Sequence, residues 1–570
     1  MKYSFVWRSR IIFFCVAIFA LILIGKLFLV QIVHSESYRE KADRQYSTPS
    51  SNIFERGAIY FSRKDNQLVS AATQTTGFKV AINPSKILDK EAVYEKFSRI
   101  ISLDKNKFFS KAGKASDPYE EIANHLTKEE ADAISALKIS NVSVFKEKWR
   151  FYPGASLASQ SLGFVAYKGT ELAGRYGLER QYNNELSRGK DNPYVNFFAE
   201  VFSNISDTFF DGEPKEGDII TTIEPGVQNF LEKTLVNVKD KYKADSIGGI
   251  VMNPQDGSIY ALGTKPDFDV NAFSKVETVS TFSNPLVENV YEFGSVIKPL
   301  VMAAAIDKGV LTADTKYDDR GSVIVENKEI FNFDKKGRGV VTMQEVLSQS
   351  LNTGMIFVYN KLGKENMREY ILSYGINEKT GVDLPNETKG LVSNLIDSPR
   401  DLEYANAAFG QGIALTPIGT MRALASISNG GNLVTPHLAD KIKYENGVEK
   451  KLEYPVSRAK ISMATSTEIT RMLVNVMDKL IQGQGKQLDS YSMAVKTGTA
   501  QIANSQGGGY YEDRHTHSFF GYFPAYDPKF IIFLYAINPK GVLYAAQTWT
   551  DPFISITKFL INYYEVSPDR

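Results

Sequence analysis

The sequence predicts an α+β protein: a catalytic domain with an antiparallel sheet flanked by helices, an α+β module before it, and one N-terminal membrane helix. Three observations predict this: a long apolar segment near the N-terminus, strand-like runs at both ends of the second half, and a helical stretch between them. Strands at both ends of a domain, with helices between, indicate one sheet assembled from distant segments with helices packed on it.

The length, net charge and cysteine content of the chain limit the number of domains, the class of partner and the disulfides that it can have. The chain has 570 residues, enough for about three domains. The net charge is +1, which gives no indication of a nucleic-acid partner. Cys15 is the single cysteine, so no intramolecular disulfide can form.

Residues 11–33 are predicted to form a transmembrane anchor. At about 1.5 Å per residue this segment would span about 34 Å, enough for a bilayer core. Lys2, Arg8 and Arg10 precede it, so residues 1–10 are expected to be a cytoplasmic tail and the remainder extracytoplasmic. A cleaved signal peptide is the alternative, but Gly25–Val30 offers no small-x-small cleavage site.

Residues 34–225 are predicted to be a stalk and a non-catalytic pedestal domain. Residues 58–61 and 77–81 are strand-like, and residues 118–138 are expected to be polar and helical. No catalytic cluster is evident in this region.

Residues 226–570 are predicted to form the catalytic domain. Apolar spacing predicts helices over 227–242 and 556–566, and a mostly helical stretch runs from about 298 to 430. Strands are expected at 248–253 and 258–262, which flank a Pro-Gln-Asp-Gly turn, and at 493–502, 518–524 and 530–537.

Ser295 and Lys298 form a candidate nucleophile and base. Pro299 is tolerated only in a first helical turn, so Ser295 is expected at a helix N-terminus with Lys298 on the same face. A serine hydroxyl needs a base to take its proton, and a lysine can do so only when neutral. The same spacing occurs at six other serines, where it indicates ordinary polar surface: Ser102, Ser135, Ser143, Ser187, Ser457 and Ser555.

Lys496 is the candidate second cation that would depress the pKa of Lys298. It precedes Thr497, Gly498 and Thr499 in a strand-like run, and the two hydroxyls could bind a carboxylate. Gly498 would let a substrate backbone approach the strand. The alternative is that Lys496 forms a surface salt bridge. A second Lys-Thr-Gly string, residues 379–381, is expected to be a loop.

Ser350 and Asn352 complete the set, on or beside a helical run over residues 341–362. A Ser-x-Asn string usually reflects surface polarity, as expected for residues 50–52. The Ser350–Asn352 string is significant because of its position: Ser350 lies 55 residues after Ser295, and Asn352 lies 144 residues before Lys496. The backbone N–H groups of Ser295 and Thr499 are candidate oxyanion-hole donors.

These three strings resemble the shared signature of the serine penicillin-recognising enzymes. Over nearly the whole chain the sequence is similar to a class B penicillin-binding protein. The strings that carry this wider likeness lie at residues 56–63, 150–153, 162–165, 174–179, 409–413, 415–417 and 429–431.

The resemblance implies a peptidoglycan D,D-transpeptidase without a cofactor or metal. Ser295 would be the acylated nucleophile and Lys298 its base, Ser350 would relay a proton to the leaving amine, and Asn352 would orient Lys298 and the substrate. Lys496, Thr497 and Thr499, with Gly498 between them, would hold the donor stem peptide and its carboxylate.

The family likeness also implies partners and a location. β-Lactams would acylate Ser295, and a membrane glycan polymerase and division proteins would be partners. The location implied is the cytoplasmic (inner) membrane, single-pass, with a periplasmic catalytic domain. Two departures from the family pattern are Phe293, where proline is usual, and Leu351, where serine is common.

Alternatives remain open. A β-lactamase or β-lactam sensor shares the signature, but no Glu-x-x-Leu-Asn string lies between Asn352 and Lys496. A non-catalytic scaffold would not need Ser295. Residues 496–501 and 518–525 resemble the septal, division-type enzyme more than the elongation type.

The sequence leaves the conformation of one segment undecided and assigns no catalytic role to two histidines. Residues 505–510 form either a mobile loop or an ordinary hairpin connection. His515 and His517 are expected to be structural.

Overall fold

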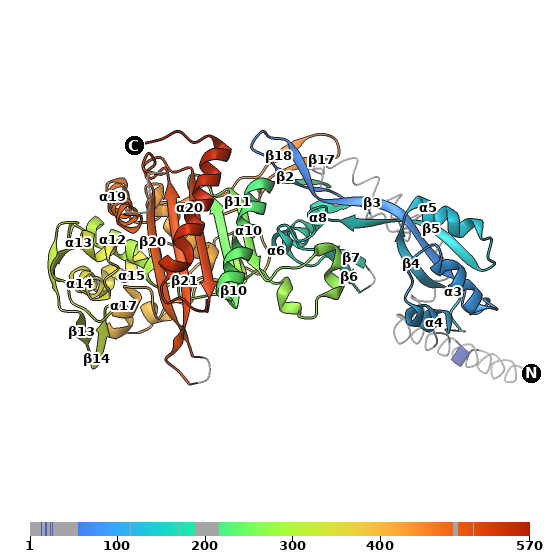
Figure 1. The fold of residues 1–570 in the computed structure, drawn as a ribbon, viewed down its shortest axis with the longest axis horizontal. Coiled ribbons are helices and arrows are strands. Elements are labelled where there is room, and N and C mark those ends of the chain that lie inside the picture. Colours follow the sequence, from blue (N-terminus) through green and yellow to red (C-terminus); the bar gives the residue numbers. More distant parts are fainter. Residues whose placement is uncertain are drawn as a thin grey trace, which may run out of the picture. The chain divides into compact units, whose positions relative to one another are not determined.

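A computed structural model describes residues 55–570 except 115, 170, 189–215, 399, 483–487 and 505–506, together with five isolated residues between Phe13 and Lys26. The chain divides into two compact units, one of residues 1–55 and 75–149, the other of residues 56–74 and 150–570 (Figure 1). The predicted anchor lies outside the described residues apart from those five. Among the helices that are described, none combines the length and the apolar character needed to cross a bilayer.

The smaller unit packs three helices on strands. The helices are α3 (Lys90–Ser98), α4 (Lys105–Ala112) and α5 (Lys128–Ala136), and β3 (Leu68–Ile82) pairs antiparallel with β4 (Glu120–Leu126). Its core includes Val80, Phe97 and Phe108. The helix predicted over 118–138 is therefore wrong in its first half. Thr127 and Glu130 form a capping box that starts the helix only at Lys128, and pairing with β3 makes the preceding residues a strand.

The larger unit contains a sheet drawn from distant parts of the chain. β2 (Ile59–Ser62) pairs antiparallel with the first part of β3 and parallel with β9 (Gly217–Thr221). β17 (Ala439–Tyr444) pairs with β9, and β18 (Glu449–Lys451) continues the sheet. The strands predicted at 58–61 and 77–81 are confirmed, the second as part of the longer β3.

Short elements connect these sheets. They are β1 (Glu55–Arg56), α6 (Ser159–Leu162), β6 (Val165–Lys168), β7 (Glu171–Gly174), α7 (Gly177–Gln181), α8 (Asn183–Leu186), β8 (Ser187–Arg188), η2 (Val270–Lys275), η3 (Val279–Phe282), α11 (Pro285–Glu288), β16 (Asn432–Leu433) and β19 (Ser457–Arg458). The longer strand β5 (Val142–Phe151) pairs with β3.

A buried ion cluster joins three of the sequence strings named above. Arg56 Nε lies 2.6 Å from Glu179 Oε2, and Arg150 Nε lies 2.5 Å from Glu179 Oε1. Tyr152 donates its hydroxyl to the same carboxylate at 3.2 Å. Burial raises the pKa of Glu179, but the two arginines outweigh it and hold that pKa below its usual value. The carboxylate is therefore charged and paired on both oxygens.

The main sheet of the larger unit has the strand order β11-β10-β22-β21-β20 and is antiparallel throughout. Its strands are β10 (Ser246–Met252), β11 (Ile259–Lys265), β20 (Ala494–Ala503), β21 (Tyr510–Phe523) and β22 (Phe530–Ile537). The predicted sheet assembled from both ends of the domain is thus confirmed. β21 begins eight residues earlier than predicted, because its exposed polar start at residues 510–514 carries no apolar alternation.

Helices cover both faces of this sheet. α10 (Pro225–Tyr242) and α20 (Ala545–Tyr564) pack together on one face, where Phe230 and Phe559 stack at 4.3 Å. Residues alternate along a strand, so adjacent side chains face opposite sides. A Cβ on Gly521 would meet both Phe553 of α20 and Val495, so Val495 faces α20 and the next residue, Lys496, faces the other side.

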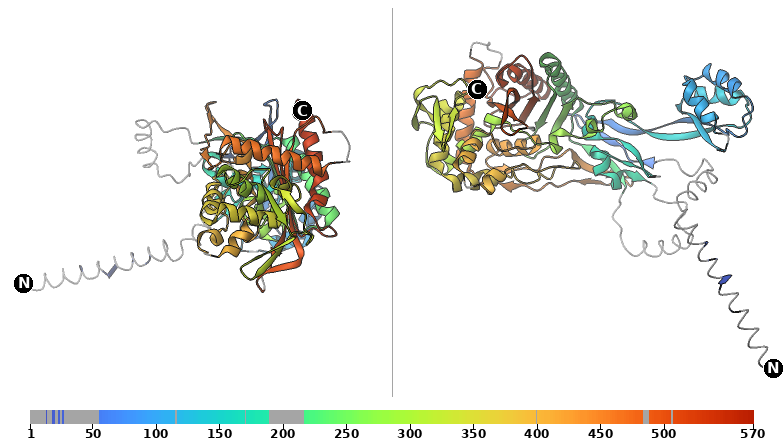
Figure 2. Two further views of the ribbon diagram at one scale, coloured as in Figure 1. Left: turned by 90° about the vertical axis from the view of Figure 1, so that its left-hand side faces the viewer. Right: turned by 90° about the horizontal axis from the view of Figure 1, so that it is seen from below.

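The other face is covered by helices from the middle of the domain, drawn in yellow-green to orange (Figures 1 and 2). They are α12 (Lys298–Asp307), α13 (Met343–Ser348), α14 (Asn352–Leu362), α15 (Lys364–Ser373), α16 (Ser393–Ile396), α17 (Asp401–Ala407), α18 (Pro417–Ser428) and α19 (Met463–Leu480). α12 is buried over nearly its whole length, as its apolar sequence after Pro299 predicts.

Two corrections concern this region and the C-terminus. The stretch predicted to be mostly helical also contains four short strands, β12 (Lys316–Asp319) paired with β15 (Gly339–Thr342), and β13 (Ser322–Val325) paired with β14 (Lys328–Phe331). Four-residue strands give too short a pattern to detect from sequence. The last helix starts at Ala545 rather than 556, because Pro552 interrupts the helical pattern yet lies inside α20.

We expect Glu179→Ala to lower the free energy of unfolding by about 3–5 kcal/mol, because it leaves Arg56 and Arg150 buried without a counter-charge. Chemical unfolding followed by circular dichroism measures this. Glu277→Ala, at an exposed position of the same unit, is the control and should change stability by less than about 0.5 kcal/mol. Equal effects of the two substitutions would contradict the role assigned to the cluster.

Candidate active site

Ser295 lies in a single turn of 3-10 helix, η4 (Gly294–Ile297), that runs directly into α12. Pro299 occupies the first turn of α12, as predicted. Ser295 is partly exposed whereas Lys298 is completely buried. No hydrogen bond holds the Ser295 hydroxyl within the described part of the chain, so it is free to meet a ligand.

Close backbone contacts set this turn against the sheet. A Cβ on Gly498 would lie 2.3 Å from the Phe293 carbonyl oxygen, and one on Gly294 would lie 2.9 Å from the Thr499 carbonyl oxygen. Gly294 also has a φ of +63°, which favours glycine. Glycine at both positions therefore lets the Ser295 turn lie directly on β20.

Phe293, the first departure from the family pattern, packs against the sheet and anchors the turn that carries Ser295. Its ring is buried and meets Phe533 of β22 edge to face, with centroids 5.0 Å apart. Its carbonyl accepts a hydrogen bond from the Ser518 hydroxyl at 2.7 Å. An aromatic anchor and a strand hydroxyl thus hold the segment that leads to Ser295.

The two candidate lysines converge on Ser350. Lys298 Nζ donates to the Ser350 carbonyl at 2.6 Å and lies 3.3 Å from its hydroxyl, and it also donates to Asn352 Oδ1 at 2.8 Å. Lys496 Nζ lies 3.0 Å from the same hydroxyl, and it donates to the Thr497 carbonyl at 2.9 Å. The predicted proximity of the two lysines is therefore confirmed.

Ser350 adopts a left-handed backbone conformation, with a φ of +55°, between α13 and α14. Such a conformation is costly for a residue with a side chain, so the surrounding structure must hold it in place. Here it turns both the carbonyl and the hydroxyl of Ser350 toward Lys298. Leu351, the second departure, is fully buried and forms the boundary of α14.

Burial controls the charge of both lysines. It lowers the pKa of Lys298 well below its usual value, and the charge of Lys496 lowers it further. Burial also lowers the pKa of Lys496, to about 7. Neither lysine forms an ion pair with any described residue, and Lys496 is only 1% exposed. The surface salt bridge considered for Lys496 is therefore wrong.

Thr497, Gly498 and Thr499 lie on β20, which is the last strand of the sheet and, among the described strands, pairs with β21 alone. Its free edge can accept an extended peptide as an additional strand. Thr497 and Thr499 are partly exposed, and Thr499 Oγ1 accepts the Ala545 N–H at 3.1 Å, at the N-terminus of α20. The second Lys-Thr-Gly string, at 379–381, lies in a loop as expected.

The other predicted features lie around this site. Ala503 pairs with Tyr510, so β20 and β21 form a hairpin whose connection includes Ser505 and Gln506, outside the described residues. His517 is fully buried, and its Nδ1 lies 2.9 Å from the Thr548 hydroxyl. Burial, with His515 nearby, lowers the pKa of His517 to about 4, which keeps it neutral. Among the described residues, no group of three or more His, Cys, Asp or Glu is arranged to hold a metal.

Three residues around the site were not predicted from the sequence: Ser518, Asn332 and Asp319. Ser518 follows His517 on β21, opposite Gly498 in the strand register, so pairing of the two predicted strands could have indicated it. Asn332 and Asp319 flank the short strands that escaped detection, and nothing in their sequence context pointed to them.

Comparison with known proteins agrees with this geometry. Residues 247–555 match the family described as "Penicillin binding protein transpeptidase domain", and residues 54–221 match the "Penicillin-binding Protein dimerisation domain".

Individual proteins are similar over almost the whole chain. "Stage V sporulation protein D" of Bacillus subtilis is 30% identical over 96% of this chain and 84% of its own length. "Peptidoglycan D,D-transpeptidase FtsI" of Buchnera aphidicola is 24% identical over 99% and 96%. Among solved structures, Penicillin Binding Protein 2X of Streptococcus thermophilus superposes with a TM-score of 0.71 at 20% identity, over 90% of this chain and 81% of its own, which shows the same fold.

The buried amine of Lys298 predicts a specific pH dependence of stability. The folded state binds this proton less tightly than the unfolded chain, whose lysine has a pKa of about 10.4, so the unfolding free energy rises with pH between the two pKa values. Lys298→Met removes this dependence. We expect the stability difference between wild type and variant to change in favour of wild type by up to about 1.4 kcal/mol per pH unit between pH 7 and 9.

Thermal unfolding at several pH values measures this difference. Lys379→Met, at an exposed lysine, is the control and should leave the slope unchanged. Parallel pH profiles for wild type and Lys298→Met would show that Lys298 is not buried as a neutral amine.

Proposed function

We propose that this chain, which belongs to the class B penicillin-binding proteins, is a serine-type peptidoglycan D,D-transpeptidase that cross-links stem peptides through an acyl-enzyme on Ser295. One observation carries the proposal: two buried amines without a carboxylate partner meet at the Ser350 hydroxyl, one from the helix that follows the Ser295 turn and one from the last strand of the sheet.

Acylation begins with the donor peptide. An extended stem peptide would add to the free edge of β20, with its terminal carboxylate held by Thr497, Thr499 and the charge of Lys496. Gly498 allows the peptide backbone to approach the strand closely. This places the D-Ala–D-Ala carbonyl over the partly exposed Ser295 hydroxyl.

Neutral Lys298 then takes the proton of Ser295 Oγ as the oxygen forms a bond to the carbonyl carbon. The N–H groups of Ser295 and Thr499 would stabilise the tetrahedral oxyanion. As the C–N bond breaks, the Ser350 hydroxyl gives its proton to the departing D-Ala amine and is reprotonated from the lysine amines that it contacts. Asn352 orients Lys298 throughout.

The second half reaction reverses these roles. An amine from a neighbouring peptide strand attacks the ester carbonyl and loses a proton to the Ser350–lysine pair. The ester bond to Ser295 breaks, and its oxygen recovers a proton from Lys298. No cofactor is required. β-Lactams, which offer a reactive amide to the same serine, would acylate Ser295 as donor mimics.

The same proposal covers the whole chain. Residues 1–10 would be cytoplasmic, residues 11–33 would anchor the protein in the cytoplasmic membrane, and residues 34–225 would form a periplasmic pedestal for the transpeptidase domain of 226–570. The apolar segment with its preceding cations supports this arrangement. A membrane glycan polymerase and division proteins are the proposed partners, by family resemblance.

The septal, division-type role is the finer proposal, and the elongation type is its alternative. Residues 496–501 and 518–525 support the septal type by resemblance. Depleting the protein in its own cells separates the two: filaments would support the septal role, and spheres would show the elongation role instead.

We expect labelled penicillin to form a covalent adduct with the wild-type protein that lasts many minutes, and Ser295→Ala to form none. Gel fluorescence after mixing and dilution measures both. Ser457→Ala, at an exposed Ser-x-x-Lys string, is the matched control and should label normally. Release of the label within seconds would identify a β-lactamase, and normal labelling of Ser295→Ala would exclude Ser295 as the nucleophile.

The pKa of Lys496, about 7, predicts how acylation depends on pH. Loss of the Lys496 proton removes the positive charge that holds the ligand carboxylate, so acylation of the free enzyme by a penicillin should fall above about pH 7. Lys496→Arg keeps its positive charge throughout the measured pH range, so the descending limb should disappear from it. Stopped-flow acylation rates from pH 5 to 10 measure this. An identical descending limb in both proteins would assign it to another group.

A further inference from the structure

The N-terminus of α14, which carries Asn352, is capped by a residue from another segment. Leu351 at the cap position supplies no side-chain hydrogen bond. Instead Asn332 Oδ1 accepts the backbone N–H groups of Asn352 at 3.0 Å and of Thr353 at 3.2 Å, and it lies 3.1 Å from the Thr353 hydroxyl oxygen. One amide oxygen thus satisfies two backbone donors at the helix end that approaches Lys298.

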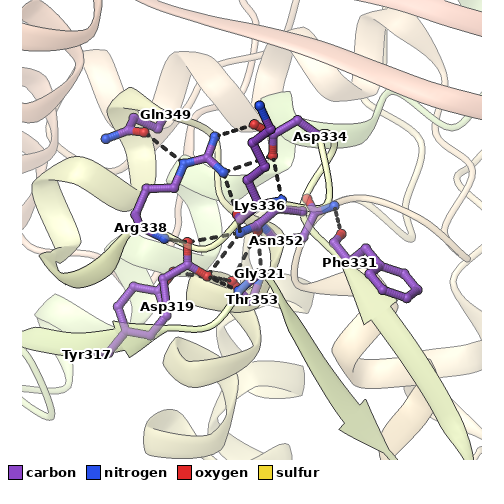
Figure 3. Close-up of polar contacts among 11 residues, drawn as sticks. Tyr317, Asp319, Gly321, Phe331, Asp334, Lys336, Arg338, Gln349, Asn352 and Thr353 are labelled. Atoms are coloured by element: carbon purple, nitrogen blue, oxygen red, sulfur yellow. Dashed lines mark hydrogen bonds and ion pairs between the residues drawn. The ribbon is translucent and has the colours of Figure 1, made fainter.

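The residue before Asn332 fixes the side chain of Asn352. Asn352 Nδ2 donates to the Phe331 carbonyl at 2.9 Å (Figure 3). This contact leaves Oδ1 as the atom that faces Lys298, where it accepts from Nζ at 2.8 Å. Phe331 and Asn332 therefore hold both the backbone and the amide orientation of Asn352.

Asp319 holds Asn332 in turn. Asn332 Nδ2 lies 3.0 Å from each carboxylate oxygen of Asp319 and 3.2 Å from the Lys336 carbonyl. Asp319 also accepts from the Thr353 hydroxyl at 2.8 Å and from the N–H groups of Gly321 and Arg338, both at 3.1 Å (Figure 3).

The carboxyl group of Asp319 is buried, and no described cation forms an ion pair with it. Asp319 and Asn332 are each 2% exposed. Within the described residues Asp319 forms no salt bridge, and the guanidinium of Arg338 instead pairs with Asp334 and donates to Gln349 (Figure 3). Burying a carboxyl group whose hydrogen-bond donors are all neutral is costly, and apolar packing would serve stability better. Three hydrogen bonds in series connect Asp319 to Lys298, through Asn332 and Asn352, so the carboxyl group is linked to the proposed base.

We propose that Asp319 and Asn332 are positioning residues for acylation: the carboxylate orients the Asn332 amide, which caps α14 and so aims Asn352 Oδ1 at the Lys298 amine. This inference rests on the proposed function, because it concerns the acylation of Ser295. Neither residue touches the substrate or a reacting atom.

The chemistry of the pair predicts the effect of Asp319→Asn. One of the two oxygens that accept from Asn332 Nδ2 becomes an NH₂ group that opposes it, so the Asn332 amide is held less firmly and its oxygen is displaced from the N–H groups of α14. The cap is weakened at constant side-chain volume. A displacement of about 1 Å at a reacting group can cost about 100-fold in rate, so we expect the acylation rate constant to fall about 10- to 100-fold. The affinity for the β-lactam before acylation should change less than about threefold.

Exchanging the side chains of residues 319 and 332 tests whether the pair acts by orienting Asn352 or only by stabilising the fold. Asn332→Asp alone places two carboxylates face to face and should lower the acylation rate at least as much as Asp319→Asn. In the double variant Asp319→Asn with Asn332→Asp, the carboxylate at 332 accepts both the new amide at 319 and the N–H groups of α14. We expect the double variant to recover to within about fivefold of wild type, above either single variant.

The measurements are the acylation rate constant and the dissociation constant for a fluorescent penicillin, by stopped flow on the full chain, with the melting temperature of each variant. Asp383→Asn is the matched control. Asp383 is also buried and accepts only neutral donors, the N–H groups of Leu438 and Ala439 and the hydroxyls of Tyr182 and Tyr454, away from the site. It should lower the melting temperature while leaving acylation of the folded protein unchanged.

Three results would overturn the inference: unchanged acylation in Asp319→Asn, a double variant no better than the single ones, or a loss seen only in affinity. A failure of the proposed function differs from these, because wild type itself would then show no Ser295-dependent label.

Discussion

Everything at the site depends on the burial of two lysine amines around one hydroxyl. Lys298 and Lys496 both reach Ser350 Oγ, and no described carboxylate neutralises either of them. Like charges in a dry pocket cannot both persist, so burial holds the pKa of each lysine below its usual value, and the deeper depression falls on Lys298, beside Lys496. The fold thereby supplies a neutral base and a nearby cation from the same residue type.

The rest of the larger unit holds these amines in place. α12 carries Lys298, β20 carries Lys496, and the junction of α13 and α14 carries Ser350. Glycines at 294 and 498 let the nucleophile's turn lie on the strand, and Phe293 anchors that turn in the core. Because β20 ends the sheet, the same strand that presents Lys496 also offers a free edge to a peptide.

Buried ionisable side chains have ion-pair partners in one part of the larger unit and lack them in another. Glu179 is buried with two arginines on its two oxygens, so its charge is compensated and its role is structural. Asp319 and the two site lysines are buried without such partners. Uncompensated burial lowers stability, and at the site it places neutral and charged amines beside the residues that the proposed reaction uses.

The sequence by itself determined the local identity of the site and the regular elements that carry it. Pro299 required a helix start beside Ser295, and the apolar alternation around Lys496 required a strand, since both are consequences of backbone geometry. Only the tertiary structure decided the approach of Lys298 to Lys496, because contacts across 50 to 200 residues depend on packing rather than on local pattern. It also decided the strands of residues 316–342, because four-residue pairings are too short to show a local pattern. For the same physical reason Asn332 and Asp319 had no sequence signal. Their function depends on a hydrogen bond across 20 residues to a helix end, and no spacing rule describes such a contact.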